Sequence, residues 1–280
     1  MSDWLEAVLP PVRFGPLGWL RVVVRGLILG ILTFGCLLIL LLVRLVEGPL
    51  FGTARPVTPY ITQFVCRSAF VILRLPLVVR GQPMTAKGAV VANHSSWLDV
   101  FALNAAQRVY FVAKAEVAGW PGIGWLARAT GTLFINRKSA EARHHQDVFE
   151  ERLKAGHRLL FFPEGTSTDA IRVLPFKPTL FQAFYTDGLR QVMNIQPVTV
   201  VFHAPKGEDS RYYGWWGEMD FASHLVKILA TARQGRVEVI FHPEVPVAAF
   251  ENRKALAAYC ERVIRNAHVN FWCNTNDPTD

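Results

Sequence analysis

A long apolar run near the start of the chain limits what this protein can fold into. Residues 26–43 read GLILGILTFGCLLILLLV, carry no charge, and are flanked by Arg25 and Arg44. At the rise of an α-helix these eighteen residues extend roughly 27 Å, the short end of what crosses a bilayer. A cleaved signal peptide does not fit, because the run starts late and no small-residue cleavage site follows it. The pattern predicts a membrane anchor rather than a buried core helix, which rarely combines such Leu and Ile content with flanking arginines.

The charges around this run predict how it meets the bilayer. Basic residues lie on both sides of it, at Arg13, Arg21, Arg25, Arg44, Arg55, Arg67 and Arg74. A spanning helix would leave one of the two groups on the side that the positive-inside rule disfavours. A shallow hairpin turning at residues 47–49, with residues 57–79 as its second arm in the interface, would keep both groups together. We therefore expect a monotopic hairpin on the cytoplasmic face of a bacterial-type inner membrane, with a single-pass helix as the alternative.

The overall charge and the cysteines narrow the choice of partners. The chain has 30 Lys and Arg against 22 Asp and Glu, an excess that suits an anionic membrane surface. Nucleic acid suits it poorly, because Leu and Val runs separate the basic residues of the N-terminal third. The cysteines have no metal-ligand spacing, so we expect reduced, structural thiols and no metal site. They are Cys36, Cys66, Cys260 and Cys273.

The rest of the chain alternates between strand-like and helix-like segments. We expect strands at 88–93, 109–113, 131–136, 158–163, 195–202 and 237–242. Apolar spacing predicts helices at 97–107, 139–155, 177–189 and 253–267, and residues 204–220 look like a loop. This alternation predicts an α/β fold, a mixed sheet flanked by helices. The predicted organisation is an anchoring region at 1–80, an α/β domain at 81–272 and a tail at 273–280.

One segment places an imidazole shortly before a carboxylate where a strand gives way to a helix. If His94 lies on the turn and Asp99 in the first helical turn, Asp99 can orient the imidazole while His94 removes a proton. Ser96 and Asp99 also fit a capping box, in which Asp99 would only satisfy the start of the helix. The same spacing recurs at His145 and Glu150 and at His203 and Glu208. Spacing alone therefore leaves a general base and a helix cap both open.

A second segment can hold an anion. Residues 161–163 lead from an apolar strand into Glu164, Gly165 and Thr166. Glycine permits a tight turn with outward-facing amides, which can bind a phosphate or a tetrahedral oxyanion. An ordinary loop at the end of a strand is the alternative interpretation.

These segments resemble four sequence blocks of the lysophosphatidate acyltransferase (glycerolipid acyltransferase) superfamily of membrane enzymes. The similar stretches, in order, are 93–99, 131–137, 162–166 and 195–198. The resemblance implies that His94 deprotonates an acceptor hydroxyl, which attacks the thioester of an acyl carrier protein or coenzyme A donor. It implies no acyl-enzyme intermediate and no cofactor. It also implies that Arg137 contacts the acceptor and allows Lys114 to neutralise donor phosphates, although Lys114 could equally be a solvated lysine at a strand end.

One departure from the family pattern bears on the acceptor, a lyso-lipid in either case. Lysophosphatidate acyltransferases commonly have Arg where this chain has Ser167, and losing that partner weakens the case for a phosphate monoester. Residues 166–169, 125–128 and 216–220 are more similar to the branch that O-acylates lyso-ornithine lipids and related aminolipids. Asp169 would suit the amine of such a zwitterionic head group. The predicted substrate-binding residues are Lys114, Arg137, Glu164, Gly165, Thr166, Ser167 and Asp169, and 1-acylglycerol-3-phosphate remains the alternative acceptor.

Two more distant functions are less compatible with the sequence. A serine hydrolase using Ser95 or Ser96 would lack the usual Gly-x-Ser-x-Gly turn. A non-catalytic lipid-binding protein would have no use for an intact His94 and Asp99 pair.

Overall fold

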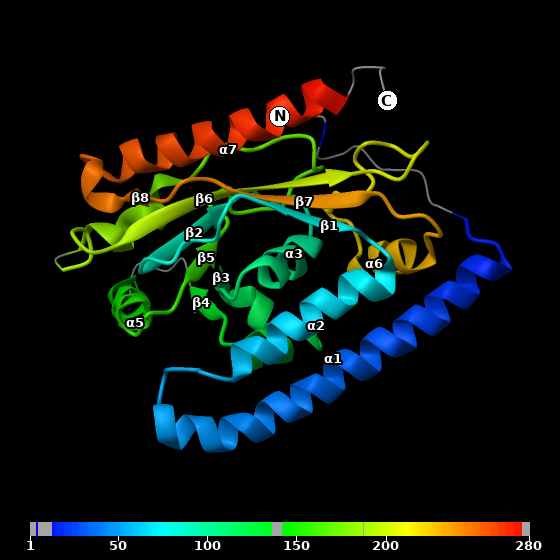
Figure 1. Cartoon of the computed structure of the whole chain (residues 1–280), viewed down its shortest axis with the longest axis horizontal. Helices are drawn as coiled ribbons and strands as arrows, with labels where there is room; N and C mark the ends of the chain where they lie inside the picture. Colours follow the sequence, from blue (N-terminus) through cyan, green and yellow to red (C-terminus); the bar gives the residue numbers. More distant parts are fainter. Residues whose placement is uncertain (1–3, 5–12, 136–141, 187, 276–280) are drawn as a thin grey trace.

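A mixed sheet forms the centre of the computed structural model, which describes residues 4, 13–135, 142–186 and 188–275 (Figure 1). In these residues eight strands join in the order β1-β7-β6-β2-β5-β3-β4, and β8 pairs with β6. Their bounds are β1 Leu77–Arg80, β2 Gly88–Ala92, β3 Tyr110–Lys114, β4 Leu133–Ile135, β5 Leu159–Phe161, β6 Asn194–His203, β7 Arg236–Phe241 and β8 Val245–Pro246. The six predicted strands and the α/β class are confirmed; β1 and β8 are additional.

The register of the central strands brings two loops together. Strand β2 pairs in parallel with β5 on one side and with β6 on the other. Ala89 faces Leu159, and Val91 faces Phe161. Because parallel strands end at the same edge of a sheet, the segments after residues 92 and 161 emerge side by side.

Helices cover both faces of the sheet. Their bounds are α1 Pro16–Phe51, α2 Thr58–Leu73, α3 Leu98–Ala106, α4 Ile123–Thr130, α5 Ala142–Lys154, α6 Phe221–Ala230 and α7 Arg253–Thr275, with 3-10 helices η1 Ala115–Gly119, η3 Pro178–Tyr185 and η4 Val247–Ala249. Alternate side chains of β2 enter opposite cores: Val90 and Ala92 join the core beneath α2, α3 and α6, whereas Ala89 and Val91 join that beneath α7. Helices α4 and α6 were not predicted, and α7 continues past the predicted domain end at 272.

The apolar N-terminal segment forms a helical hairpin of α1 and α2 on the outside of the domain (Figure 1). The most apolar eighteen-residue stretch of helix α1 has a mean hydropathy of 2.9, and the helix is long and apolar enough to cross a membrane. The predicted turn at 47–49 is wrong, because α1 runs on to Phe51. Pro49 is tolerated there since it removes a hydrogen bond only near the helix end. The second arm is also shorter than predicted, because Leu77–Arg80 joins the sheet as β1.

A buried carboxylate closes the hairpin. Glu47 accepts hydrogen bonds from the amides of Val57 and Thr58 at 2.7 and 3.2 Å. It also accepts from the hydroxyl of Thr58 at 2.8 Å and pairs with Arg44 at 3.1 Å. These contacts draw the start of α2 back against the last turns of α1, which places the reversal of the chain at residues 52–57.

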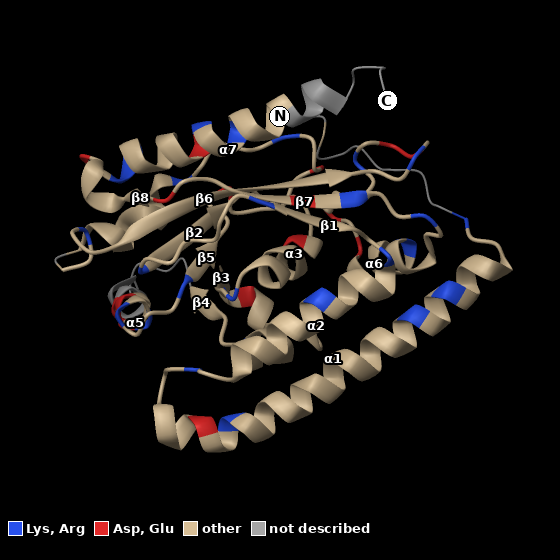
Figure 2. Cartoon of the chain, in the orientation of Figure 1, with Lys and Arg blue, Asp and Glu red and all other residues tan. Residues whose placement is uncertain are grey.

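Four hairpin arginines contact the α/β domain through helix ends. Arg21 and Arg25 donate to carbonyls at the C-terminal end of α6, on Ala230 at 2.7 Å and on Leu229 at 2.9 Å. Arg55 donates to the carbonyl of Ala129 at the end of α4, and Arg67 donates to the carbonyl of Ala105 at the end of α3. Helix C-terminal carbonyls lack intrahelical partners and carry partial negative charge. These arginines therefore dock the hairpin, so their positions no longer support the charge argument for a monotopic topology. Figure 2 shows the uncharged stretch of α1 between two basic residues near its start and an adjacent basic and acidic pair near its end.

Candidate active site

His94 and Asp99 meet at the carboxyl end of β2. His94 follows the strand, and Asp99 lies in the first turn of α3. Nδ1 of His94 is 2.7 Å from Oδ2 of Asp99, which is fully buried, while the imidazole is 19% exposed. A carboxylate that accepts from Nδ1–H leaves Nε2 with its lone pair, the form that takes up a proton.

Asp99 also holds the backbone in front of α3. Its Oδ2 accepts hydrogen bonds from the amides of Ser95 at 2.7 Å and Ser96 at 3.0 Å. Asp99 thus does what both interpretations required: it binds the backbone at the start of α3 and it contacts the imidazole of His94. The cap fixes the position from which Asp99 orients His94.

The loop after β5 fixes His94 from the other side. The amide of His94 donates to Oε1 of Glu164 at 2.7 Å, and its carbonyl accepts from the amide of Thr168 at 3.0 Å and from that residue's hydroxyl at 3.1 Å. The ring of Phe162 stacks on the imidazole with centroids 4.0 Å apart and planes 10° apart. The backbone and the ring of His94 are therefore both positioned by the second motif.

Glu164 is a buried carboxyl group behind the histidine. Its second oxygen accepts from the amide of Leu174 at 2.6 Å. Burial raises the pKa of Glu164 to about 8, despite the opposing hydrogen bonds from Leu174 and His94. Glu164 thus links the two loops and does not line the cavity that holds His94.

The turn at Gly165 has features of an anion site. Gly165 adopts a φ of 75°, and a β-carbon there would lie 2.6 Å from Nζ of Lys177. Within the described residues the amides of Thr166 and Ser167 donate to no other residue, and both residues line the cavity. Two amides and an ammonium group beside His94 can together hold negative charge.

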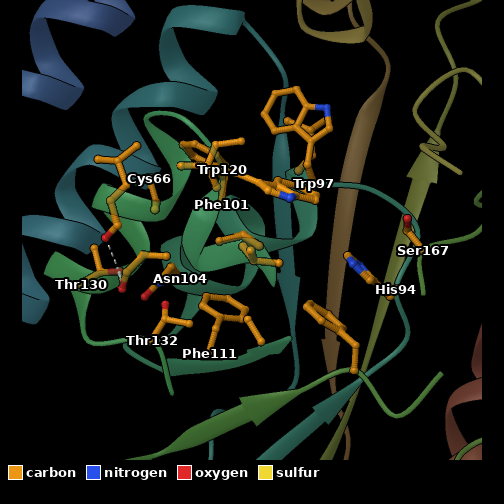
Figure 3. A pocket seen from close by; sticks show the side chains of 18 of the residues that line it. Cys66, His94, Trp97, Phe101, Asn104, Phe111, Trp120, Thr130, Thr132 and Ser167 are labelled. Carbon is orange, nitrogen blue, oxygen red and sulfur yellow. Dashed lines mark hydrogen bonds between the residues drawn. The ribbon is translucent and has the colours of Figure 1, made fainter. Parts of the chain in front are cut away.

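His94 lies at one end of a cavity of about 1160 Å³. Figure 3 shows Ser167 on the same side as His94, with Cys66, Asn104, Thr130 and Thr132 at the opposite end. The lining includes Leu37 from α1 and Phe70 from α2, so the hairpin forms part of the wall. The cavity has the size and the apolar character of a site for a lipid chain.

The other predicted substrate-binding residues occupy different environments. Lys114 ends β3, is exposed and lines the cavity. Asp169 is buried and pairs with Arg172, whose Nε lies 3.1 and 3.0 Å from its two carboxylate oxygens. Asp169 does not line the cavity that holds His94, and its carboxylate is already paired with that guanidinium group. Arg137 lies outside the described residues.

Several contacts of the site were not foreseen from the sequence. Thr168 was not among the predicted site residues, yet its hydroxyl donates a hydrogen bond to the carbonyl of His94. The amide of Trp215 donates to the carbonyl of Ser95 at 2.9 Å. The run of aromatic residues around Trp215 marked this segment as unusual. The sequence did not show that the segment contacts Ser95, which lies 120 residues earlier. The side chain of Gln196, in the fourth block, accepts a hydrogen bond from the amide of Met84 and donates one to the carbonyl of Gln82, in the segment between β1 and β2.

Comparison with known proteins shows that the similarity to acyltransferases covers nearly the whole chain. Residues 78–201 match the family described as Acyltransferase. The chain is 56% identical over 264 residues to the lyso-ornithine lipid O-acyltransferase of Rhodobacter capsulatus, covering 94% of this chain and 96% of that protein. It is 38% identical over 115 residues to the 1-acyl-sn-glycerol-3-phosphate acyltransferase of Neisseria gonorrhoeae, covering 40% and 45% of the two chains.

A solved structure has the same fold. The crystal structure of the 1-acyl-sn-glycerophosphate acyltransferase PlsC from Thermotoga maritima matches with a TM-score of 0.57. The match covers 88% of this chain and 97% of that one, at 22% sequence identity. The similarity includes the mixed sheet and its flanking helices.

Proposed function

Because the chain belongs to the acyltransferase family and is an acyltransferase enzyme, we propose that it moves a fatty acyl group from a thioester to the hydroxyl of a lyso-aminolipid of the lyso-ornithine type. The observation that carries this proposal is the hydrogen bond between His94 and Asp99 at one end of a lipid-sized cavity. The Rhodobacter relative, which matches nearly the whole chain, supports the acceptor class.

The geometry supports a direct transfer. Nε2 of His94 takes the proton of the acceptor hydroxyl as its oxygen attacks the thioester carbonyl. The oxyanion that forms is stabilised by the amides of Thr166 and Ser167. When the carbon–sulfur bond breaks, the imidazolium returns the proton to the leaving thiolate. Asp99 stabilises the imidazolium between these two steps.

The donor and the membrane complete the proposal. An acyl carrier protein or coenzyme A thioester supplies the acyl group, and Lys114 at the cavity wall suits the donor's phosphates. Arg137 remains a proposed acceptor contact from the family resemblance. Helices α1 and α2 would sit among lipid chains on the cytoplasmic face of an inner membrane. The cavity would then lie at the depth of the acceptor's own acyl chain.

A phosphate-bearing acceptor is the second candidate. Lys177 places an ammonium group over Gly165, where a phosphate monoester of 1-acylglycerol-3-phosphate could bind. Ser167 supplies no charge at the adjacent position.

Competition between the two acceptors tests the proposal. Purified enzyme in mixed micelles would receive a thioester donor with lyso-ornithine lipid or 1-acylglycerol-3-phosphate, and kcat/KM would be measured for each. We expect a clear preference for the lyso-ornithine lipid and loss of both activities in His94→Ala. A preference for the phosphate acceptor would overturn the acceptor assignment. Full activity in His94→Ala would overturn the mechanism.

A further inference from the structure

Four aromatic side chains from separate segments form one wall of the cavity that holds His94. This aromatic wall consists of Trp97, Trp120, Trp215 and Phe221, and all four line the cavity. The ring centroids lie 6.2 Å apart for Trp120 and Trp215, 6.3 Å for Trp215 and Phe221, and 5.3 Å for Trp97 and Phe221. The corresponding planes meet at 85°, 82° and 71°. Each ring is thus close to perpendicular to the next, and the four rings pack edge to face along one side of the cavity.

The aromatic wall is tied to the catalytic loop. Trp97 lies three residues after His94 and directly precedes α3. The amide of Trp215 donates to the carbonyl of Ser95 at 2.9 Å. Figure 3 shows Trp97 and Trp120 with the other lining residues around the cavity. A group held by the wall is therefore held at a fixed position relative to His94.

Two indole N–H groups of the wall are already used. Nε1 of Trp97 donates to Nδ1 of His224 at 2.9 Å, and Nε1 of Trp215 donates to the carbonyl of Met219 at 2.9 Å. Burial and the nearby Lys227 lower the pKa of His224 to about 3, so its ring is neutral and can accept the bond. With these donors engaged, the two indoles can contribute π surface to the cavity but no hydrogen bond from Nε1. An aromatic face attracts a cation, and Trp does so most strongly.

Charges of both signs stand on the same cavity. Glu116 lines it and lies in η1, four residues before Trp120, and Lys114 lines it two residues earlier. A carboxylate beside aromatic faces favours an ammonium group, whereas a nearby lysine favours a carboxylate. The arrangement matches a zwitterionic head group better than a phosphate monoester, which carries negative charge alone.

We propose that the aromatic wall, together with Glu116 on the lining of the same cavity, binds the ammonium group of the acceptor's head group and so positions its hydroxyl at His94. This inference rests on the proposed function, because only an aminolipid acceptor brings such a cation. It also provides a cation site other than Asp169, whose carboxylate is engaged with Arg172.

Kinetics with an acceptor of altered charge test this proposal. Trp120→Leu, Trp120→Phe and Glu116→Gln would be assayed in mixed micelles with lyso-ornithine lipid and with the same lipid acetylated on its free amine. Trp120 is 41% exposed, and losing a cation–π contact at such a ring weakens binding by roughly two- to fivefold. We therefore expect Trp120→Leu to raise KM about two- to fivefold for the cationic acceptor, with a smaller rise for Trp120→Phe, which keeps a ring, and a rise for Glu116→Gln. For the acetylated acceptor, KM should already be high in the wild type and should not change in the variants.

A matched control separates this role from membrane contact. Trp125 lies on α4, is 64% exposed and does not line the cavity, so Trp125→Leu should behave as wild type. Equal losses of Trp120→Leu for both acceptors, or an equal effect of Trp125→Leu, would overturn the inference while leaving the proposed function standing. A wild-type enzyme that rejects lyso-ornithine lipid would instead overturn the proposed function. The KM for the donor and the thermal midpoint of each variant should stay at wild-type values, and a selective change in acceptor KM cannot come from misfolding.

Discussion

The amide of His94 donates a hydrogen bond to Oε1 of Glu164 at 2.7 Å, so the loops after β2 and β5 share one buried connection. The two residues are seventy positions apart, and the parallel pairing of their strands brings them together. The base and the anion-binding turn therefore form one rigid unit, and a change in either loop is transmitted to the other.

Replacing Asp99 with Asn should reduce catalysis without weakening binding. Oδ2 of Asp99 alone accepts from Nδ1 of His94 and from the amides of Ser95 and Ser96. An asparagine oxygen in that position keeps these contacts but lacks the negative charge that stabilises the imidazolium, whereas an amino group there loses all three. We expect kcat to fall by about 10²- to 10⁴-fold with little change in the KM of either substrate. Glu208→Gln is the control, since His203 has the same sequence spacing to Glu208 but pairs with Glu238 at 3.3 Å. A comparable loss in that control would contradict the role of the Asp99 contact.

Glu164 should make stability depend on pH. Burial raises its pKa from 4.5 to about 8, so between these values the folded chain holds a proton that the unfolded chain releases. The contribution of this group to the free energy of unfolding is therefore full below about pH 4.5 and declines as pH rises to about 8. Thermal midpoints of the detergent-solubilised protein from pH 5 to 9 should fall across this window. Glu164→Gln should be less stable at pH 5 and should lack this part of the slope, so an unchanged slope would refute the assignment.

Arg25 should contribute to stability through the end of α6. Its guanidinium group is buried and donates to the carbonyls of Leu229 at 2.9 Å and Thr231 at 2.6 Å. Arg25→Leu should lower the free energy of unfolding by about 1.5–3 kcal/mol, as expected for hydrogen bonds from a charged group. Denaturation in the same detergent would measure this loss, and Arg13→Leu, at an exposed position, should lose little. Equal stability of the two variants would show that the docking contacts are weak.

Restoring a cation at position 167 should shift the choice of acceptor. Ser167 lines the cavity near His94, so Arg there could form two hydrogen bonds with a phosphate monoester (Figure 3). We expect Ser167→Arg to raise kcat/KM for 1-acylglycerol-3-phosphate by about tenfold or more relative to lyso-ornithine lipid. Ser167→Gln controls for side-chain bulk and should lower both activities without changing their ratio. An unchanged ratio in the Arg variant would mean that position 167 does not contact the head group.

The sequence predicts the parts of this protein that depend on local patterns. The strands around His94 and Glu164 are short apolar runs ended by turn residues, so their positions follow from neighbouring side chains alone. The geometry of His94 and Asp99 also follows locally, because a turn and the first helical turn connect them. The mixed sheet and its flanking helices follow from the same alternation.

Contacts between distant segments could not be read in the same way. An arginine beside an apolar run looks the same whether it meets lipid head groups or, like Arg25, the carbonyls of a helix two hundred residues later. The turn of the hairpin was misplaced because Gly48 and Pro49 are common turn residues, whereas Glu47 determines where the chain reverses by binding Val57 and Thr58. Asp169 shows a similar limit, since its partner Arg172 became evident only from the conformation of the loop.

The docking of α1 and α2 has a practical consequence for protein engineering. Anchors of membrane enzymes are often deleted to obtain a soluble catalytic fragment. A fragment starting at residue 81 would lose β1, which pairs with β7, and would open the cavity along the side closed by Leu37 and Phe70. It would also leave the last carbonyls of α3, α4 and α6 without their arginine partners. A soluble version of this enzyme is better sought by replacing the outward-facing leucines of α1 with polar residues than by removing the helix.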